Sequence, residues 1–495
     1  MAGPVIDHRT STTRRGMQTL VVTSLSAVLV FGTLTAINVA LPAMAADLGA
    51  AAGTADWFLI AFMLANTAFI LVFGRLSDTI GRRPLYLGGV GLFTVAGLVC
   101  AAAPDAGTVI AMRLLQGVGA ACAVSNSTAV LTDAFPPHRL AFGLSLNIVS
   151  GAVSSLLGPL VGGLLVDGFG WRSIFLAGGP LGLLAVGLGW YALRGTHRPR
   201  GRRDPYDGRG ALLSCAGLAA VLLAVNRASV WGPADARVVL LFGLGVAALV
   251  AFVLVERRVP APLLDLSLVA GRRALRYAAA FFAASSFSAV LVLVVLYRQV
   301  VEGASATEAG LAALPMGLAM LAAAGVAGAL ARRVRIRTLA TAGAVVMAAG
   351  LAALTAELAA PGTPAALTLR SSCSGSARAC SWRRSPRDDA RRAGRPPRRR
   401  QRAAVVMHNG AQALSTAAVL LVVALWTGPS YAAGSAPPDA HVGFAVAALV
   451  LTGCALAGAV CAAFQPPDPP PAVRPAPVVT GTRRGDEPCP SPIRS

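Results

Sequence analysis

The sequence contains no lysine, few charged residues and few aromatic ones. All 43 of its basic side chains are arginines, and only 6% of its residues are aromatic. Charged residues make up 13% of the 495 positions, against about 25% in a soluble protein of ordinary composition. Hydrophobic residues reach 55%, with a mean hydropathy of +0.66. This composition argues against a soluble globular chain and indicates a membrane protein, and the arginine bias, with so much Ala, Gly and Pro, indicates a GC-rich genome.

Motifs for metal, redox and nucleotide chemistry are also missing. The eight cysteines are scattered and form no CxxC or Cys/His pattern, so we interpret them as small hydrophobic residues of helices. No GxxxxGK[ST] phosphate-binding loop is present, which argues against a process driven by ATP. We therefore expect no enzymatic activity, no cofactor and no metal. The net charge of +22 lies largely in short segments between apolar runs, so we expect no nucleic-acid partner.

Long apolar runs dominate what remains. A helix of about 20 apolar residues suffices to cross a hydrocarbon core of about 30 Å. In each of these runs the expected helix is apolar on all of its faces, as a helix in lipid requires. The sequence predicts thirteen spans, near 18–42, 57–74, 84–103, 108–131, 141–166, 173–193, 210–226, 238–255, 276–298, 309–331, 338–358, 403–426 and 442–464. The fold class we expect is an all-α membrane protein.

Charge alternates between successive connecting segments up to Glu357. Arginine-rich segments such as Arg194 to Arg209 alternate with segments that are acidic or nearly neutral, such as those around Asp105 and Glu302. Basic connections stay in the cytoplasm. We therefore expect a multi-pass protein of the cell membrane, surrounded by the lipid bilayer, whose N-terminus is cytoplasmic.

The alternation fails in the segment Arg370–Arg402, which holds twelve arginines and two aspartates. Each arginine costs about 2.5–3.5 kcal/mol at the bilayer centre, so this segment is not expected to cross. One interpretation is a basic cytoplasmic loop. The other interpretation, which we favour, is a frameshifted stretch whose reading frame is later restored. If residues 370–387 are assigned GC-rich codons and these are read two bases later, the translation can be an apolar helix. That helix would make fourteen spans and return the C-terminus to the cytoplasm.

Several motifs occur in a characteristic order. The first span carries TLTAINVALP (33–42), and the connection after the second span reads GRLSDTIGRRPL (74–85). The fourth span carries RLLQGVGAA (113–121), and the fifth carries GAVSSLLGPLVGGLL (151–165). Together these motifs resemble the fourteen-span drug:proton antiporter branch of the major facilitator superfamily.

The resemblance implies a role for each motif. The connection after the second span would form a gating loop between the two halves of the molecule, through Gly74, Asp78, Gly81, Arg82 and Arg83. Asp78 would pair with Arg82 or Arg83 or face a helix N-terminus, unless the loop is a simple solvated turn. The fourth span would serve proton coupling through Arg113, Gln116 and Gly117. The alternative interpretation of Arg113 is a side chain that extends from its helix end to water. The fifth span would carry the antiporter motif of Gly151, Gly158, Pro159, Gly162 and Gly163.

The first-span motif departs from the pattern of related drug exporters. Those proteins often place Asp or Glu ahead of the Asn-Val-Ala-Leu-Pro run, where this chain has Thr33, and we find no other clearly mid-membrane carboxylate in the first six spans. This difference argues against strongly cationic substrates and also weakens the expectation of proton coupling. The polar residues we expect in a substrate cavity, or else in ordinary hydrogen bonds between helices, are Asn38, Asn66, Asn126 and Asn147.

The expected organisation follows the resemblance. Residues 1–193 would form the N-terminal six-helix bundle, 194–270 a cytoplasmic linker with two extra membrane helices, 271–464 the C-terminal bundle, and 465–495 a disordered cytoplasmic tail. The expected function is export of small amphipathic organic compounds in exchange for protons, by a monomer. Two alternatives stay open: an importer on the same scaffold, and an impaired, non-transporting product of a frameshifted gene.

Overall fold

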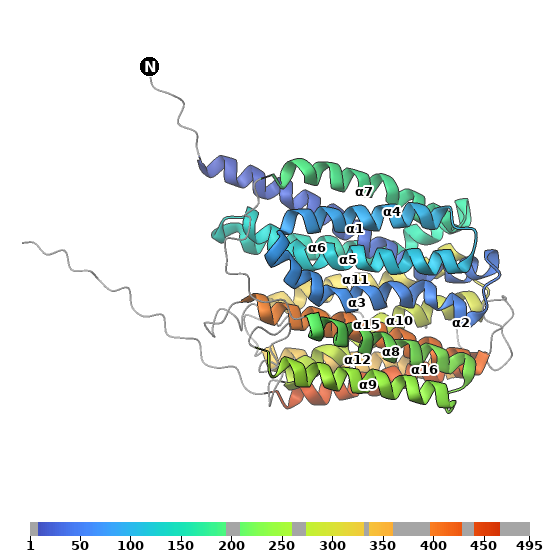
Figure 1. Cartoon of the computed structure of the whole chain (residues 1–495). Helices are drawn as coiled ribbons and strands as arrows, with labels where there is room; N and C mark the ends of the chain where they lie inside the picture. The colour runs from blue at the N-terminus through green and yellow to red at the C-terminus, as the bar shows by residue number, and fades with distance from the viewer. Residues whose placement is uncertain are drawn as a thin grey trace, which may run out of the picture.

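The computed structural model describes residues 8–194, 208–259, 274–330, 336–359, 397–427 and 440–465. All regular elements within these ranges are helices, arranged with their long axes roughly parallel (Figure 1). The helices are α1 (His8–Asp47), α2 (Ala52–Ala55), α3 (Trp57–Ile80), α4 (Arg82–Ala101), α5 (Ala106–Ala134), α6 (Pro137–Phe169), α7 (Arg172–Ala192), α8 (Gly208–Trp231), α9 (Ala236–Glu256), α10 (Ala274–Val300), α11 (Ala306–Leu330), α12 (Ile336–Ala359), α15 (Pro397–Thr427) and α16 (Ala440–Ala463).

Thirteen of the described helices are long and apolar enough to cross a membrane, which confirms the number expected from the sequence. The short helix α2 is the exception. Several helices extend beyond the predicted apolar runs, because the polar residues that flank a run continue the same helix. The second span, for example, was expected to end near residue 74 but continues as α3 to Ile80.

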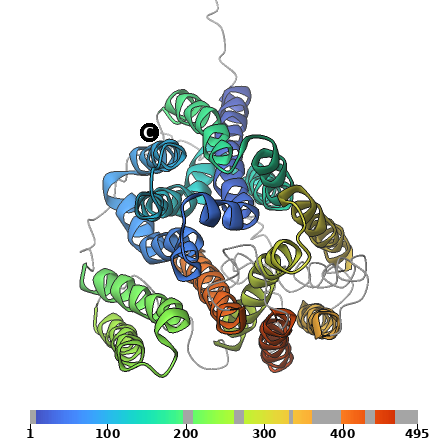
Figure 2. The same ribbon diagram turned by 90° about the vertical axis from the view of Figure 1, so that its right-hand side faces the viewer.

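The helices gather into two groups. In the first group, α1 packs on α6 and α7, and α5 packs on α3 and α4. In the second, α16 packs on α10 and α12, and α15 packs on α10. The two groups meet where α6 contacts α11, where α3 contacts α15 and where α1 contacts α10 (Figure 2). We call them the first bundle (α1–α7) and the second bundle (α10–α16).

Helices α8 and α9 form a hairpin beside the junction of the two bundles, against α15 and α3 (Figure 2). Two glycines let the hairpin close. A methyl group at residue 245 would lie 2.8 Å from Val221 N, and one at residue 217 would lie 3.0 Å from Leu249 N. The hairpin thus matches the two extra helices expected between the bundles.

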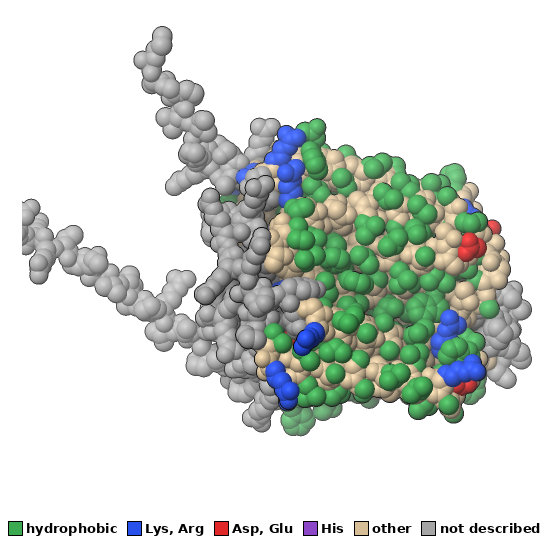
Figure 3. Space-filling model, in the orientation of Figure 1, with side chains coloured by type: hydrophobic (Ala, Val, Ile, Leu, Met, Phe, Trp, Pro, Cys, Tyr) green, Lys and Arg blue, Asp and Glu red, His purple; other side chains and the backbone are tan. Residues whose placement is uncertain are grey.

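Charged side chains collect at the two ends of the helix bundle, and apolar side chains cover its flank (Figure 3). Arg82, Arg83 and Arg194 lie at the end we call the basic end, while Asp105, Asp167 and Glu302 lie at the opposite, acidic end. Large apolar side chains are exposed between the ends, for example Leu240 of α9 at 64%. A flank of this kind is the surface that a bilayer covers.

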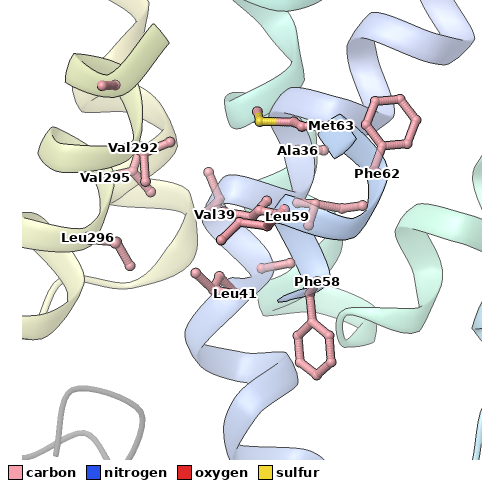
Figure 4. Close-up of a cluster of buried hydrophobic side chains, with 14 of the residues drawn as sticks. Ala36, Val39, Leu41, Phe58, Leu59, Phe62, Met63, Val292, Val295 and Leu296 are labelled. Carbon is pink, nitrogen blue, oxygen red and sulfur yellow. The ribbon is translucent and has the colours of Figure 1, made fainter. Parts of the chain in front are cut away.

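The apolar core runs from one bundle into the other without interruption. One cluster includes Val39 of α1, Leu59 of α3 and Val295 of α10, which lie together in Figure 4. Because α10 belongs to the second bundle, this cluster holds the bundles together near the acidic end.

Most of the arginine-rich segment lies outside the described residues. These begin again at Pro397, so the frameshift interpretation of 370–402 concerns residues that the structure largely leaves aside. The same holds for 195–207 and 260–273 of the linker and for 466–495 of the tail. The domain limits given above stay predictions.

Candidate functional site

The segment expected to be a gating loop is almost entirely helical. Gly74 and Asp78 belong to α3, Arg82 and Arg83 begin α4, and Gly81 alone connects the two helices. Gly81 has φ 110° and ψ 151°, a backbone conformation open to glycine and strained for other residues. The connection is therefore a single-residue turn rather than a loop, because one glycine reverses the chain between the helices.

The two arginines after this turn contact partners within the first bundle. Arg82, only 9% exposed, forms an ion pair with Asp133 at the end of α5 and donates to Ala129 O at 3.2 Å. Arg83 donates to Trp190 O of α7 at 3.0 Å and its guanidinium lies 4.9 Å from the centre of the Trp190 ring. The side chain of Asp78 lies outside the described residues, so its expected pairing stays a prediction.

Arg113 is fully buried in the first bundle. Its Nε donates to Phe58 O of α3 at 2.8 Å, and its Nη1 donates to Gln116 Oε1 at 3.0 Å. The guanidinium also lies 4.5 Å from the centre of the Phe62 ring, a cation–π contact. Among the described residues its Nη2 has no hydrogen-bond partner. Arg113 therefore takes the carbonyl-type partners that a buried guanidinium needs and does not extend to the helix end.

Gln116 accepts from Arg113, and the adjacent Gly117 lies at a tight contact between α5 and α3. A methyl group at residue 117 would lie 2.7 Å from Ala65 Cβ and would overlap Phe62 O, so glycine is what lets α5 approach α3. Gln116 lines a small cavity together with Thr33. Thr33, where the first-span motif departs from the acid that related exporters often carry, thus shares this cavity with the hydrogen-bond partner of Arg113.

The glycines of α6 face two different helices. Gly151, Gly158 and Gly162 face α1: a methyl group at residue 162 would lie 2.7 Å from Ala36 Cβ, and one at 158 would overlap Thr35 Oγ1. Ser154 on the same stripe donates to Val28 O at 2.8 Å. These three glycines and Ser154 are therefore packed against α1 inside the first bundle, and the antiporter role expected for the motif stays a prediction.

The other face of α6 meets α11 across the junction of the bundles. A methyl group at Gly163 would lie 2.5 Å from Ala306 O and 2.7 Å from Thr307 Cα. One at Gly310 would overlap Pro159 O. Pro159 and Gly163, which the sequence grouped with the stripe, thus belong to the contact between bundles.

Two polar residues at this junction were missed by sequence reasoning. Asp167, at the end of α6, accepts hydrogen bonds from Ala306 N at 3.2 Å and Thr307 N at 2.7 Å. Gln299 of α10 donates to Val39 O of α1 at 2.9 Å. The sequence offered only an indirect signal, the S-x-x-E pattern of 305–308 that marks the start of α11.

The four asparagines are distributed over four helices. Asn38 and Asn126 are buried, with 4% and 0% exposed, and Asn147 accepts a hydrogen bond from Ser127 at 3.3 Å. Each of the four retains one buried amide atom without a hydrogen-bond partner within the described ranges, and no hydrogen bond there joins any two of them. Burying an unpaired polar atom costs free energy, so these four atoms are notable, and the expected role of the asparagines in a substrate cavity stays a prediction. The described residues hold no group of three or more metal-ligating side chains.

Comparison with known proteins gives one family match and several sequence relatives. The family model described as Major Facilitator Superfamily matches residues 23–382. The chain is 38% identical over 330 residues to the puromycin resistance protein pur8 of Streptomyces alboniger, covering 65% of this chain and 64% of that protein. It is 33% identical over 347 residues to the cephamycin export protein CmcT of Amycolatopsis lactamdurans, covering 69% and 71% respectively. The matched region therefore spans somewhat under two thirds of the puromycin resistance protein.

The fold also matches a solved structure. The POT family transporter PepTSo superimposes with a TM-score of 0.64 at 14% identity, over 91% of this chain and 97% of that one. At this identity the likeness concerns the arrangement of the helices.

Proposed function

The chain belongs to the major facilitator superfamily, and from this membership we propose that it exports small amphipathic organic compounds, antibiotics among them, in exchange for protons. The names of its relatives support the export direction, since one is a resistance protein and another an export protein. In this proposal the chain is a monomer, and its N-terminus and the basic end of the molecule face the cytoplasm.

The observation that carries the proposal is the contact between α6 and α11. Secondary transporters expose a midplane site to each side in turn by rocking one bundle against the other. Here Gly163 and Gly310 bring the two backbones into direct contact toward the acidic end, with Gly163 against Ala306 and Thr307 and Gly310 against Pro159 O. Small residues let two helix backbones approach closely, and such a contact can separate and re-form, as a rocking motion requires.

Arg113 supports the proton-coupling part. A charge buried within a membrane span is costly and is kept for a function. We propose that Arg113, Gln116 and Gly117 form the part of the first bundle that responds to the proton, through the contact of Arg113 with Phe58 O. The asparagines at 38, 66, 126 and 147 would provide polar contacts for the substrate.

The proposal is tested in cells that lack their own exporters. Cells producing the chain should accumulate less puromycin than cells producing Asp78→Asn at equal protein level, and they should be more resistant. A protonophore should abolish the difference. An importer would instead raise accumulation above that of the variant, and equal accumulation in both strains would contradict a transport function for these compounds.

A further inference from the structure

The acidic end holds a cross-bundle contact that none of the sequence motifs contains. Asp167 lies in the last turn of α6, and its two carboxylate oxygens accept hydrogen bonds from Ala306 N and Thr307 N, the first two residues of α11. The carboxylate therefore caps a helix of the opposite bundle.

Each of the backbone N–H groups at the start of α11 has an identified hydrogen-bond acceptor. The first N–H groups of a helix have no partner within it. Glu308 N is satisfied by Ser305 Oγ at 3.2 Å, and Glu308 Oε2 in turn accepts from Ser305 N at 2.9 Å, a capping box within α11 itself. The donors of Ala306 and Thr307 are left, and Asp167 takes both. Two of the donors at this helix start thus depend on the other bundle.

Geometry and charge both favour this arrangement. Gly163 lies one helical turn before Asp167 and admits the α11 backbone, with a methyl group at 163 only 2.7 Å from Thr307 Cα. A negative charge at a helix N-terminus interacts favourably with the helix dipole. Asp167 itself is exposed, so the contact can open without leaving a charge buried.

We propose that Asp167 is a gating residue, which keeps the acidic end closed by capping α11 and releases it whenever that end opens. This gating role presupposes the transport function proposed above. Opening at the acidic end separates α6 from α11, so it must expose the amide groups of Ala306 and Thr307 to water. Loss of the carboxylate shifts the protein toward the state that is open at the acidic end and closed at the basic end.

Hydrogen–deuterium exchange on the full chain in lipid nanodiscs tests the gating role of Asp167 without any transport assay. In Asp167→Ala, the amides at the start of α11 should exchange about tenfold faster, as expected for loss of a charge-assisted hydrogen bond. Exchange should also rise around Val39 and Gln299, the second contact at this end, and fall at the basic end around Ser77–Arg83. Asp167→Asn, which retains one acceptor oxygen, should fall between wild type and Asp167→Ala.

The matched control is Glu308→Ala, which removes the acceptor of Ser305 N in the capping box of α11 and leaves the cross-bundle bonds in place. It should speed exchange only at the start of α11. If Asp167→Ala behaves in the same way, with no change at Gln299 and none at the basic end, Asp167 is a helix cap and the gating role is overturned. Since exchange is measured without substrate, failure of the gate and failure of the export proposal are distinguished.

Discussion

Gly158 of α6 lies so close to Thr35 of α1 that a methyl group at residue 158 would overlap the threonine hydroxyl. That hydroxyl donates to Phe31 O at 2.9 Å within its own helix, so it has little freedom to move aside. The contact between α1 and α6 is therefore a close contact within the first bundle, while Gly163, five residues further on, belongs to the contact with α11.

This difference predicts separate effects for two glycine substitutions. Gly158→Leu should destabilise the first bundle by about 1–3 kcal/mol through overpacking and lower the thermal unfolding temperature. Gly163→Leu should leave that temperature nearer to wild type and reduce export, because the acidic end cannot close. Gly168→Ala, where nothing lies within 4 Å, is the control on the same helix. Equal losses of stability in both leucine variants would show that the two faces of α6 are not distinct.

The turn at Gly81 gives a second prediction. Its φ of 110° is accessible to glycine, so Gly81→Ala should cost about 1–3 kcal/mol of stability through backbone strain alone. Gly88→Ala in α4 is the matched control, since residue 88 is helical and has open space around it. Thermal unfolding of the purified variants measures the effect. An unfolding temperature unchanged by Gly81→Ala would mean that the turn relaxes to another conformation.

The ion pair between Arg82 and Asp133 gives a third prediction. Because Arg82 is only 9% exposed, each single change to alanine should be clearly destabilising, and the double variant should lose less than the sum. We expect a coupling energy of about 0.5–3 kcal/mol from a double-mutant cycle of unfolding. A coupling energy of zero would indicate that Arg82 is paired elsewhere, with Asp78 as the next partner to test.

A fourth prediction concerns Thr33, which shares a small cavity with Gln116. Thr33→Asp places a carboxylate at the cavity that Gln116 also lines and should make export more dependent on the proton gradient and more tolerant of cationic compounds. Thr33→Asn, similar in size and uncharged, is the control. The comparison is the ratio of export of a cationic dye to export of a neutral compound. If that ratio is the same in both variants, the position does not determine substrate charge.

The sequence predicted the helices better than it predicted their contacts. Apolar length determines which segments cross a membrane, so the thirteen spans could be predicted without structure. Helix ends were less predictable, because polar residues such as Asp78 continue α3 past its apolar part. Which helix a glycine faces depends on how the bundles pack. The stripe of Gly151, Gly158 and Gly162 was therefore recognised, but its neighbour α1 was not.

The same limit applies to the polar residues. Arg113 was recognisable because a charge within an apolar run is rare. Its bond to Phe58 O was not, because that bond joins helices far apart in the chain. Asp167 was not singled out from the sequence, since its significance depends on α11 lying 139 residues further along the chain.

The most direct test of the export account uses the purified full chain in proteoliposomes with a defined pH gradient. With the interior acidic, puromycin should enter the vesicles that contain the wild-type chain, and protons should leave them at the same time. Both fluxes should disappear in Asp78→Asn and should not require ATP. Puromycin uptake that proceeds at the same rate without a pH gradient, or with no movement of protons, would contradict exchange for protons.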